Sequence, residues 1–333
     1  MNQISSNPVY DIALGYQKTA ALTAAIKLDL FTAIGSETLT AEALAVTTKA
    51  SVRGIRILCD FLTVIGLLAK RESAYSLVPA SRRLLDRASP FAIGGTIDFL
   101  AAPEMISLVA GDPLTYVLGG GSPGLANVAS DNPVWVRFAR SMAPFASVTA
   151  KRVASQIVAS PNRPRSVLDV AAGHGLYGIE VALVSPAATV TALDWAEVLE
   201  VARANAEAAG IQDRYRTIAG SAFQVDWGRE HDLVLLPNIL HHFGREDCVA
   251  LLRRARSALT RDGRAIVIDF VPNADRVSPP EAASFAFWML ATTPHGDAYT
   301  LADYDVMAKQ AGFAGATGHS LSPTPQTLVA FEG

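Results

Sequence analysis

This sequence contains few cysteines and carries little net charge. Its 333 residues include two cysteines, Cys59 and Cys248, which lie too far apart to match a disulfide or metal-binding spacing. This usage fits a reducing compartment, so we expect a cytoplasmic protein. The formal net charge is only −3, which argues against a nucleic-acid partner and against an anionic membrane surface.

Export and membrane signals are also missing. The first residues, MNQISSNPVYD, lack the basic segment and the apolar core of a signal peptide. A long uncharged run, residues 113–130, is rich in glycine, proline and serine and would not span a bilayer. Hydrophobic residues make up 50% of the chain and charged residues 18%, so a sizeable core is available. We therefore expect a soluble globular protein of two or more domains, with no membrane partner.

The N-terminal part has the pattern of a winged helix. Residues 9–34 are alanine-rich, free of proline and apolar on nearly every face, which predicts one helix packed on two sides, partly against another subunit. A short helix, a turn, a second helix over 51–65 and an alternating hairpin over 67–79 follow. Such a module binds DNA, here through Arg53 and Arg56, or mediates dimerisation. The second helix is mostly apolar and the chain is acidic, so we favour dimerisation.

The pattern changes after Pro161 and Pro164. From Ser166 onward, strand-like segments alternate with helical ones, which predicts a parallel, doubly wound sheet. Residues 315–333 predict two further strands joined by a proline-containing turn. The strands are expected in SVLDVAA, ATVTALDW, RYRTIAGS, HDLVLLPN and RAIVIDFV. We thus divide the chain into residues 1–90, a helical linker over 91–160, and residues 161–333.

A glycine-rich turn follows the first of these strands. Gly173, Gly175 and Gly178 have the G-x-G-x-x-G spacing, a weak signal alone but a stronger one between a strand and a helix. The second strand ends at Asp194, where a carboxylate can accept both ribose hydroxyls of an adenosine. Two ligands share this geometry, a dinucleotide such as NAD and S-adenosylmethionine.

Charge separates these two ligands. Asp169 lies four residues before Gly173, where a negative charge would oppose a pyrophosphate but suit a cationic sulfonium and its ammonium group. The expected antiparallel ending of the sheet is usual for class I methyltransferases and less so for dehydrogenases. The sequence therefore favours S-adenosylmethionine over NAD.

These residues resemble the S-adenosylmethionine-dependent small-molecule O-methyltransferases, a family that includes plant phenolic and bacterial natural-product enzymes. The resemblance covers essentially the whole chain and implies an α/β fold. Residues 161–333 would form a class I methyltransferase Rossmann-like sheet, behind a mostly α-helical, winged-helix-like dimerisation domain over 1–90. The linker over 91–160 would contribute to the substrate pocket, and the protein would be a homodimer. The matching motifs are LDVAAGHG for the family's LDVGGGxG, ALDW, NILHHFGREDCVALLRR for W-x-L-H-D-W-x-D-E-x-C, AIVIDFVP, and MLATTPHGDAYTLADYDVMAKQAGF.

The resemblance also implies a cofactor site. Asp194 would take the ribose hydroxyls, and Trp195 would lie near the adenine. Ser221 stands where the family has an acid, although a hydroxyl still accepts one hydrogen bond. Asn238 would lie at the mouth of the site. The implied cofactor-binding residues are Asp169, Ala171, Gly173, Gly175, Asp194, Trp195, Ser221, Ala222, Phe223 and Asn238.

The family's general base falls on His241. An alcohol or phenol is a poor nucleophile, and a nearby imidazole removes its proton as attack on the methyl carbon proceeds. His242 replaces the family's Asp, and because adjacent side chains diverge, the pair predicts no metal site.

Two acids orient this base in the family. Asp269 matches the first and is one methylene shorter. The second would fall on Ala298, next to Asp297, which we include among the catalytic candidates, and His295 is an alternative helper.

The acceptor is expected to be a small aromatic or hydrophobic molecule, because apolar residues dominate the expected pocket. The candidate pocket residues are Phe99, Met142, Phe285, Phe287, Trp288 and Met289. The favoured activity is methyl transfer to a hydroxyl. The alternatives are methylation of sulfur, nitrogen or carbon, a non-methylating reaction such as decarboxylation, a ligand-sensing winged-helix regulator, and an NAD-dependent dehydrogenase.

Overall fold

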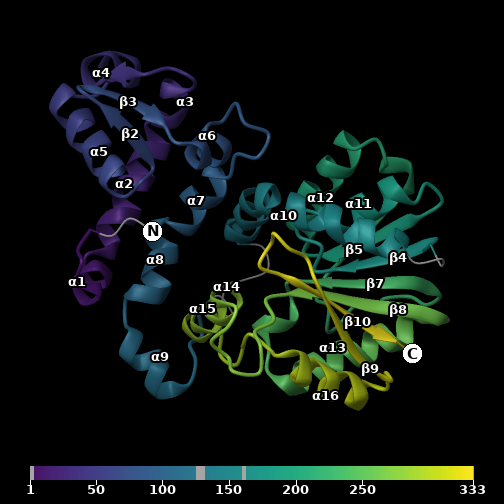
Figure 1. The fold of residues 1–333 in the computed structure, drawn as a ribbon. Helices are drawn as coiled ribbons and strands as arrows, with labels where there is room; N and C mark the ends of the chain where they lie inside the picture. Colours follow the sequence, from purple (N-terminus) through teal and green to yellow (C-terminus); the bar gives the residue numbers. More distant parts are fainter. Residues whose placement is uncertain (1–3, 125–131, 160–162, 333) are drawn as a thin grey trace. The chain divides into compact units, whose positions relative to one another are not determined.

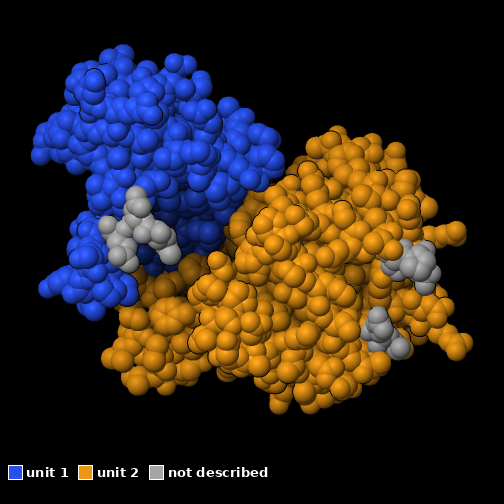
Figure 2. Space-filling view, in the orientation of Figure 1, with its two compact units in different colours: residues 1–106 blue, residues 107–333 orange. Residues whose placement is uncertain are grey.

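The structure, a computed structural model, describes residues 4–124, 132–159 and 163–332. Pro161, one of the prolines expected to mark a domain boundary, lies outside the described residues. The chain packs as two compact units, Met1–Ile106 and Ser107–Gly333 (Figure 2).

The first unit is helical with one small sheet. Strands β1, β3 and β2 form it in that order, and β2 and β3 are the hairpin that the alternating sequence predicts. The predicted second helix is α5. The elements are α1 (Pro8–Ala13), α2 (Gly15–Lys27), α3 (Leu30–Ile34), β1 (Leu39–Thr40), α4 (Ala41–Thr48), α5 (Val52–Val64), β2 (Leu68–Arg71), β3 (Ala74–Leu77), α6 (Pro79–Leu85) and α7 (Gly94–Leu100), with α8 (Pro103–Ala110) reaching the second unit.

The prediction of one buried helix over residues 9–34 is wrong. The chain forms α1, α2 and α3 instead, with breaks at Leu14 and around Asp29, whose φ of 54° is left-handed and ends helical hydrogen bonding. The C-terminal part of this region is buried, but the start is not. Four large apolar side chains are 62–80% exposed in the single chain, Val9, Tyr10, Ile12 and Tyr16.

The second unit is built on a seven-stranded sheet in the order β6-β5-β4-β7-β8-β10-β9 (Figure 1). Strands β4 to β8 are parallel, and β10 pairs antiparallel with both β8 and β9. Each predicted strand is present, and the α/β fold class is confirmed. The elements are α9 (Pro113–Gly119), α10 (Pro133–Ala159), β4 (Ser166–Val170), α11 (Leu176–Val184), β5 (Thr189–Asp194), α12 (Ala196–Ala208), η1 (Gln212–Arg214), β6 (Tyr215–Ala219), β7 (His231–Pro237), η2 (Leu240–His242), α13 (Arg245–Ala258), β8 (Leu259–Asp269), α14 (Pro280–Ala283), α15 (Phe285–Thr292), α16 (Leu301–Ala311), β9 (Gly315–Ser320) and β10 (Thr327–Glu332).

Helices cover both faces of this sheet (Figure 1). One apolar cluster joins the strands to α10, α11 and α12, and another joins them to α13 and α16. Because both faces are covered, the central strands are apolar on both sides, which is why they appear in the sequence as continuous apolar runs. The carboxyl ends of β4, β5, β7 and β8 lie at one edge of the sheet, where open parallel sheets bind ligands.

The expected linker over 91–160 is divided between the two units. Helix α7 packs against α2 in the first unit, whereas α10 packs against α11 and α12 in the second. The three-part division of the chain therefore stays a prediction. Within the described ranges, no helix is long and apolar enough to cross a membrane.

Candidate functional site

The glycine-rich turn joins β4 to α11 at the ligand-binding edge. Gly175 has a φ of 75°, and a Cβ there would lie 2.4 Å from the Tyr215 hydroxyl. A Cβ on Gly178 would lie 2.7 Å from Val190 and 3.0 Å from the Asp169 carboxylate. Both glycines thus permit close packing of α11 against the sheet and against α12. The position of Gly173 is different, because among the described residues the atom nearest to an added Cβ would be the Ala171 carbonyl oxygen, 4.0 Å away.

Two carboxylates flank this turn. Asp169 is fully buried, and its Oδ2 accepts the Gly178 N–H at 3.0 Å, while its Oδ1 has no partner among the described residues. Burial raises the pKa of Asp169 to about 7, with the Gly178 hydrogen bond opposing the shift. Asp194 accepts the Gly173 N–H at 2.8 Å and the Trp195 N–H at 2.7 Å. Its pKa is raised to about 6 by burial, against those two hydrogen bonds. A cationic ligand at this turn would favour the ionised form of both acids.

The other residues expected at the cofactor gather at the ends of neighbouring strands. The Trp195 ring packs in a small cluster with Trp135 and Ala139 of α10. After β6, the Ser221 hydroxyl accepts the Phe223 N–H at 3.2 Å, so it closes a local turn. The carbonyl of Ala222 accepts the indole N–H of Trp227 at 2.9 Å.

Asn238 lies directly after β7 in the left-handed conformation, with a φ of 54°. Its amide donates to the Tyr177 hydroxyl at 3.4 Å, and its carbonyl oxygen accepts the amide of Gln326. This network joins α11 to the start of β10 at the ligand-binding edge.

The structure brings His241 and Asp269 together. Nδ1 of His241 lies 2.6 Å from Oδ1 of Asp269, and the two side chains are only 5% and 1% exposed. A carboxylate only accepts, so Nδ1 carries the proton and Nε2 is left as a proton acceptor. The Phe285 ring lies edge-on to the imidazole, with centroids 4.8 Å apart, and stacks on Phe270 at 4.1 Å. The pair therefore lies in a buried environment with aromatic rings on one side.

His242 has a different environment. Its ring lies 4.4 Å from the His241 ring, and burial, together with His241, holds the pKa of His242 well below its usual value. A neutral imidazole is therefore expected there throughout the physiological pH range.

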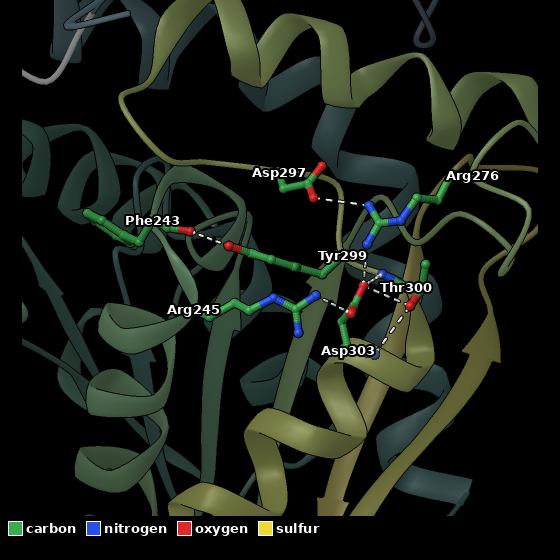
Figure 3. A network of polar contacts seen from close by, with 7 residues as sticks. All are labelled: Phe243, Arg245, Arg276, Asp297, Tyr299, Thr300 and Asp303. Atoms are coloured by element: carbon green, nitrogen blue, oxygen red, sulfur yellow. Dashed lines mark hydrogen bonds and ion pairs between the residues drawn. The ribbon is translucent and has the colours of Figure 1, made fainter. Parts of the chain in front are cut away.

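Asp297 contacts His241 through its main chain. The Asp297 N–H donates to the His241 carbonyl at 3.0 Å, whereas its carboxylate accepts Arg276 at 3.0 Å. Arg276 also donates to Asp303 at 2.7 Å, and Asp303 accepts Arg245 as well (Figure 3). The Asp297 carboxylate thus takes part in a surface ion network, and its role as a second acid for the imidazole stays a prediction.

Two residues that contact the His241–Asp269 pair have no counterpart among the predicted site residues. Tyr304 of α16 donates its hydroxyl to Oδ2 of Asp269 at 2.8 Å. A Cβ on Gly296 would lie 2.2 Å from the His241 carbonyl oxygen, so only glycine allows this approach of the loop. His295 is exposed, and Ala298 is buried. No sequence motif points to Tyr304, because a tyrosine in an amphipathic helix is ordinarily a core residue.

The expected acceptor residues have varied surroundings. Met289 is buried core and Phe287 is 50% exposed, with its ring 5.8 Å from that of Tyr116 on α9. Met142 and Trp288 are half-buried, and Phe99 is buried in the first unit. Of these candidates, Phe285 is the residue whose ring contacts His241.

Two family models match the chain. One, an O-methyltransferase domain, matches residues 110–314, and the other, an O-methyltransferase dimerisation domain, matches residues 10–87. Among curated proteins, the chain is similar to 3-hydroxy-5-methyl-1-naphthoate 3-O-methyltransferase of Streptomyces sahachiroi, with 28% identity over 91% of this chain and 88% of that protein. It is also similar to acetylserotonin O-methyltransferase of Mus musculus, with 27% identity over 91% of this chain and 82% of that protein.

Solved structures agree over nearly the full length. A structure described as a candidate O-methyltransferase from Nostoc punctiforme PCC 73102 superposes with a TM-score of 0.93 and 44% identity, covering 99% of this chain and 100% of that one. Human N-acetylserotonin methyltransferase in complex with SAM has a TM-score of 0.84 and 21% identity, covering 99% of each chain, which shows the shared fold.

Proposed function

The chain belongs to the family of S-adenosylmethionine-dependent O-methyltransferases, and from that premise we propose that it methylates a hydroxyl of a small aromatic or hydrophobic molecule, with His241 as general base. The observation that carries this proposal is the buried His241–Asp269 pair, 2.6 Å apart, at the same sheet edge as the glycine turn.

The residues at the turn fit S-adenosylmethionine, which supplies an activated methyl group on a cationic sulfur. Asp169 offers a buried, unpartnered carboxylate oxygen to a cation. Gly173 leaves room for close approach, and Asp194 would hold the ribose hydroxyls. Trp195 would pack against the adenine, and Asn238 would lie toward the methyl group. A diphosphate would instead meet two carboxylates, which disfavours NAD.

Cofactor affinity should depend on pH through Asp169. Its pKa is raised to about 7, so it is protonated in much of the free protein below that pH. A cation beside it favours the ionised form, so binding releases a proton and affinity rises with pH. Between pH 5 and pH 7 we expect S-adenosylmethionine to bind about tenfold more tightly, the effect of one pKa unit. Calorimetry in buffers of different ionisation enthalpy measures both affinity and proton release, and Asp169→Asn should weaken the dependence. Tighter binding at pH 5 would contradict this role.

His241 then acts on the acceptor hydroxyl. Its Nδ1–H is held by Asp269, so Nε2 would accept the proton of the acceptor hydroxyl as that oxygen takes the methyl group and the carbon–sulfur bond of the cofactor breaks. The imidazolium that forms is stabilised by the ionised carboxylate beside it. Phe285 and Phe270 keep water from the ring, which strengthens that pairing.

The test of this function is product formation. The protein is incubated with S-adenosylmethionine and a panel of phenols, thiols and amines, starting with 3-hydroxy-5-methyl-1-naphthoate and N-acetylserotonin, the acceptors named for two relatives. We expect S-adenosylhomocysteine and an O-methylated product with at least one phenol. Transfer confined to thiols or amines would favour methylation of another atom, and substrate loss without S-adenosylhomocysteine would favour a non-methylating reaction.

A homodimer is proposed on the match to the dimerisation domain and on the exposed apolar start of the chain. We expect a mass in solution of twice the 35.2 kDa of one chain. The double variant Ile12→Asp, Tyr16→Asp should shift it toward the single-chain mass, because it places charges on apolar side chains that a partner would cover. Leu183→Asp, at an exposed position of the second unit, is the control. Light scattering that gives a single-chain mass for the unaltered protein would refute the dimer.

A further inference from the structure

We propose that Tyr304 is a positioning residue for the base, its hydroxyl holding the Asp269 carboxylate against His241 and tuning the proton affinity of the pair. This inference rests on the proposed function, because it takes His241 to be the base.

The three side chains form a continuous buried chain of hydrogen bonds. The Tyr304 hydroxyl donates to Oδ2 of Asp269 at 2.8 Å, and Oδ1 lies 2.6 Å from Nδ1 of His241. The Phe270 N–H also donates to Oδ1, at 2.8 Å. Tyr304 and Asp269 are both 0% exposed, so water does not reach the carboxylate from outside. In such a buried site, a hydrogen bond donated to an ionised acceptor is stronger than one at the surface. Each donor also stabilises part of the carboxylate's negative charge, so less of that charge acts on the other donors.

Helix α16 fixes the direction of the tyrosine. It starts at a capping box in which the Thr300 hydroxyl accepts the Asp303 N–H, while the Asp303 carboxylate accepts the Thr300 N–H at 2.9 Å. One turn in, the Tyr304 ring packs between Tyr299, at a centroid distance of 6.0 Å, and Phe331, at 6.3 Å. Burial and the Asp269 charge raise the pKa of Tyr304 well above its usual value, so its hydroxyl remains a donor in the working pH range.

Most of the titratable groups around the pair are neutral near pH 7. Burial raises the pKa of the Cys248 thiol to about 12, raises that of Tyr177 above its usual range and lowers that of His242. These groups are therefore neutral near pH 7. The Asp297 carboxylate is paired with Arg276. The groups that act on the pair by charge or hydrogen bond are Tyr177, His242, Cys248 and Tyr304. Asp169, which acts on Tyr177 as Asp269 does, has a pKa of about 7, so its titration is followed in the same experiment through Asp169→Asn.

Loss of the Tyr304 hydroxyl should change the proton affinity of the His241–Asp269 pair in one direction. Without it, the full negative charge of Asp269 is available to His241, and the ionised carboxylate loses a stabilising donor. Both effects raise the proton affinity of the coupled pair. In Tyr304→Phe, which keeps the ring, we expect the pKa of His241 and the acidic limb of the kcat profile to move up by about 0.5–1 unit. The KM for S-adenosylmethionine should stay unchanged.

Tyr299→Phe is the matched control. The Tyr299 hydroxyl donates to the Phe243 carbonyl at 2.6 Å and not to Asp269, so its removal should leave the pKa of His241 where it is. A second variant carries 3-fluorotyrosine at position 304. Because its phenol is a stronger donor, it should shift the pKa of His241 in the opposite direction, down.

The experiment is NMR titration of histidine-labelled full-length protein. The chain has six histidines, and the His241 signal is assigned by its absence in His241→Gln. An upward shift in Tyr304→Phe, none in Tyr299→Phe and a downward shift with fluorotyrosine support the proposal. An unshifted His241 pKa in both position-304 proteins overturns it. This readout needs no turnover, so an absence of methyl transfer would refute the proposed function and leave the Tyr304 result to be judged on its own.

Discussion

In His241→Ala we expect kcat for methyl transfer to fall by about 10²- to 10⁴-fold, the range that a positioned general base contributes. The affinity for S-adenosylmethionine should change by less than about twofold, because the residues proposed to hold the cofactor, apart from Asn238, lie in or after strands other than β7. Turnover is followed as S-adenosylhomocysteine release, and cofactor affinity by calorimetry. If the variant still binds S-adenosylmethionine but no longer releases S-adenosylhomocysteine, the substitution has affected the chemical step.

His319→Ala is the control for this experiment. His319 is exposed on β9, so its removal should leave kcat and the melting temperature close to those of the unaltered protein. His241→Ala also leaves Asp269 without one of its donors, so the melting temperature is measured alongside. A folded variant with full turnover would remove His241 from the mechanism.

The second large effect is expected at Asp194. In Asp194→Asn, the Kd for S-adenosylmethionine should rise by about 10- to 100-fold, since a hydrogen bond to a charged group contributes about 1.5–3 kcal/mol. The ribose hydroxyls would lose their ionised acceptor, and the Gly173 N–H, which donates to the same carboxylate at 2.8 Å, would lose its own. Calorimetry gives the affinity directly.

Glu200→Gln is the control, because it removes a nearby carboxylate that is not proposed to bind the ribose. Glu200 is exposed on α12 and pairs with Arg203, so cofactor affinity should stay within about twofold of the original, as for other exposed ion pairs. Equal affinities in the Asp194 and Glu200 variants would show that Asp194 does not hold the ribose.

The sheet was predictable from sequence because each central strand is buried on both faces. Val167–Val170, apart from Asp169, and the run LVLLP over 233–237 are apolar without alternation, and turn residues bound them. The glycine spacing and the position of Asp194 then predict, without any tertiary information, that Asp169 and Asp194 lie at the same edge of the sheet. The pairing of His241 with Asp269 followed from the resemblance, because both lie near the carboxyl ends of strands in matching motifs.

Side-chain direction and local backbone were not predictable in the same way. Residues 9–34 form three helices, since Asp29 adopts a left-handed conformation that an alanine-rich pattern does not reveal. The carboxylate of Asp297 is on Arg276, a partner 21 positions earlier in another loop. Tyr304 reaches Asp269 across 35 positions, and its hydroxyl is invisible to a hydrophobicity pattern.

The most direct measurement is calorimetric titration of the full chain with S-adenosylmethionine and, separately, with NAD. The two acids at the glycine turn predict saturable binding of S-adenosylmethionine, one molecule per chain, and no heat of binding with NAD. Saturable binding of NAD, or none of S-adenosylmethionine, would contradict the assignment of this turn to a cationic methyl donor.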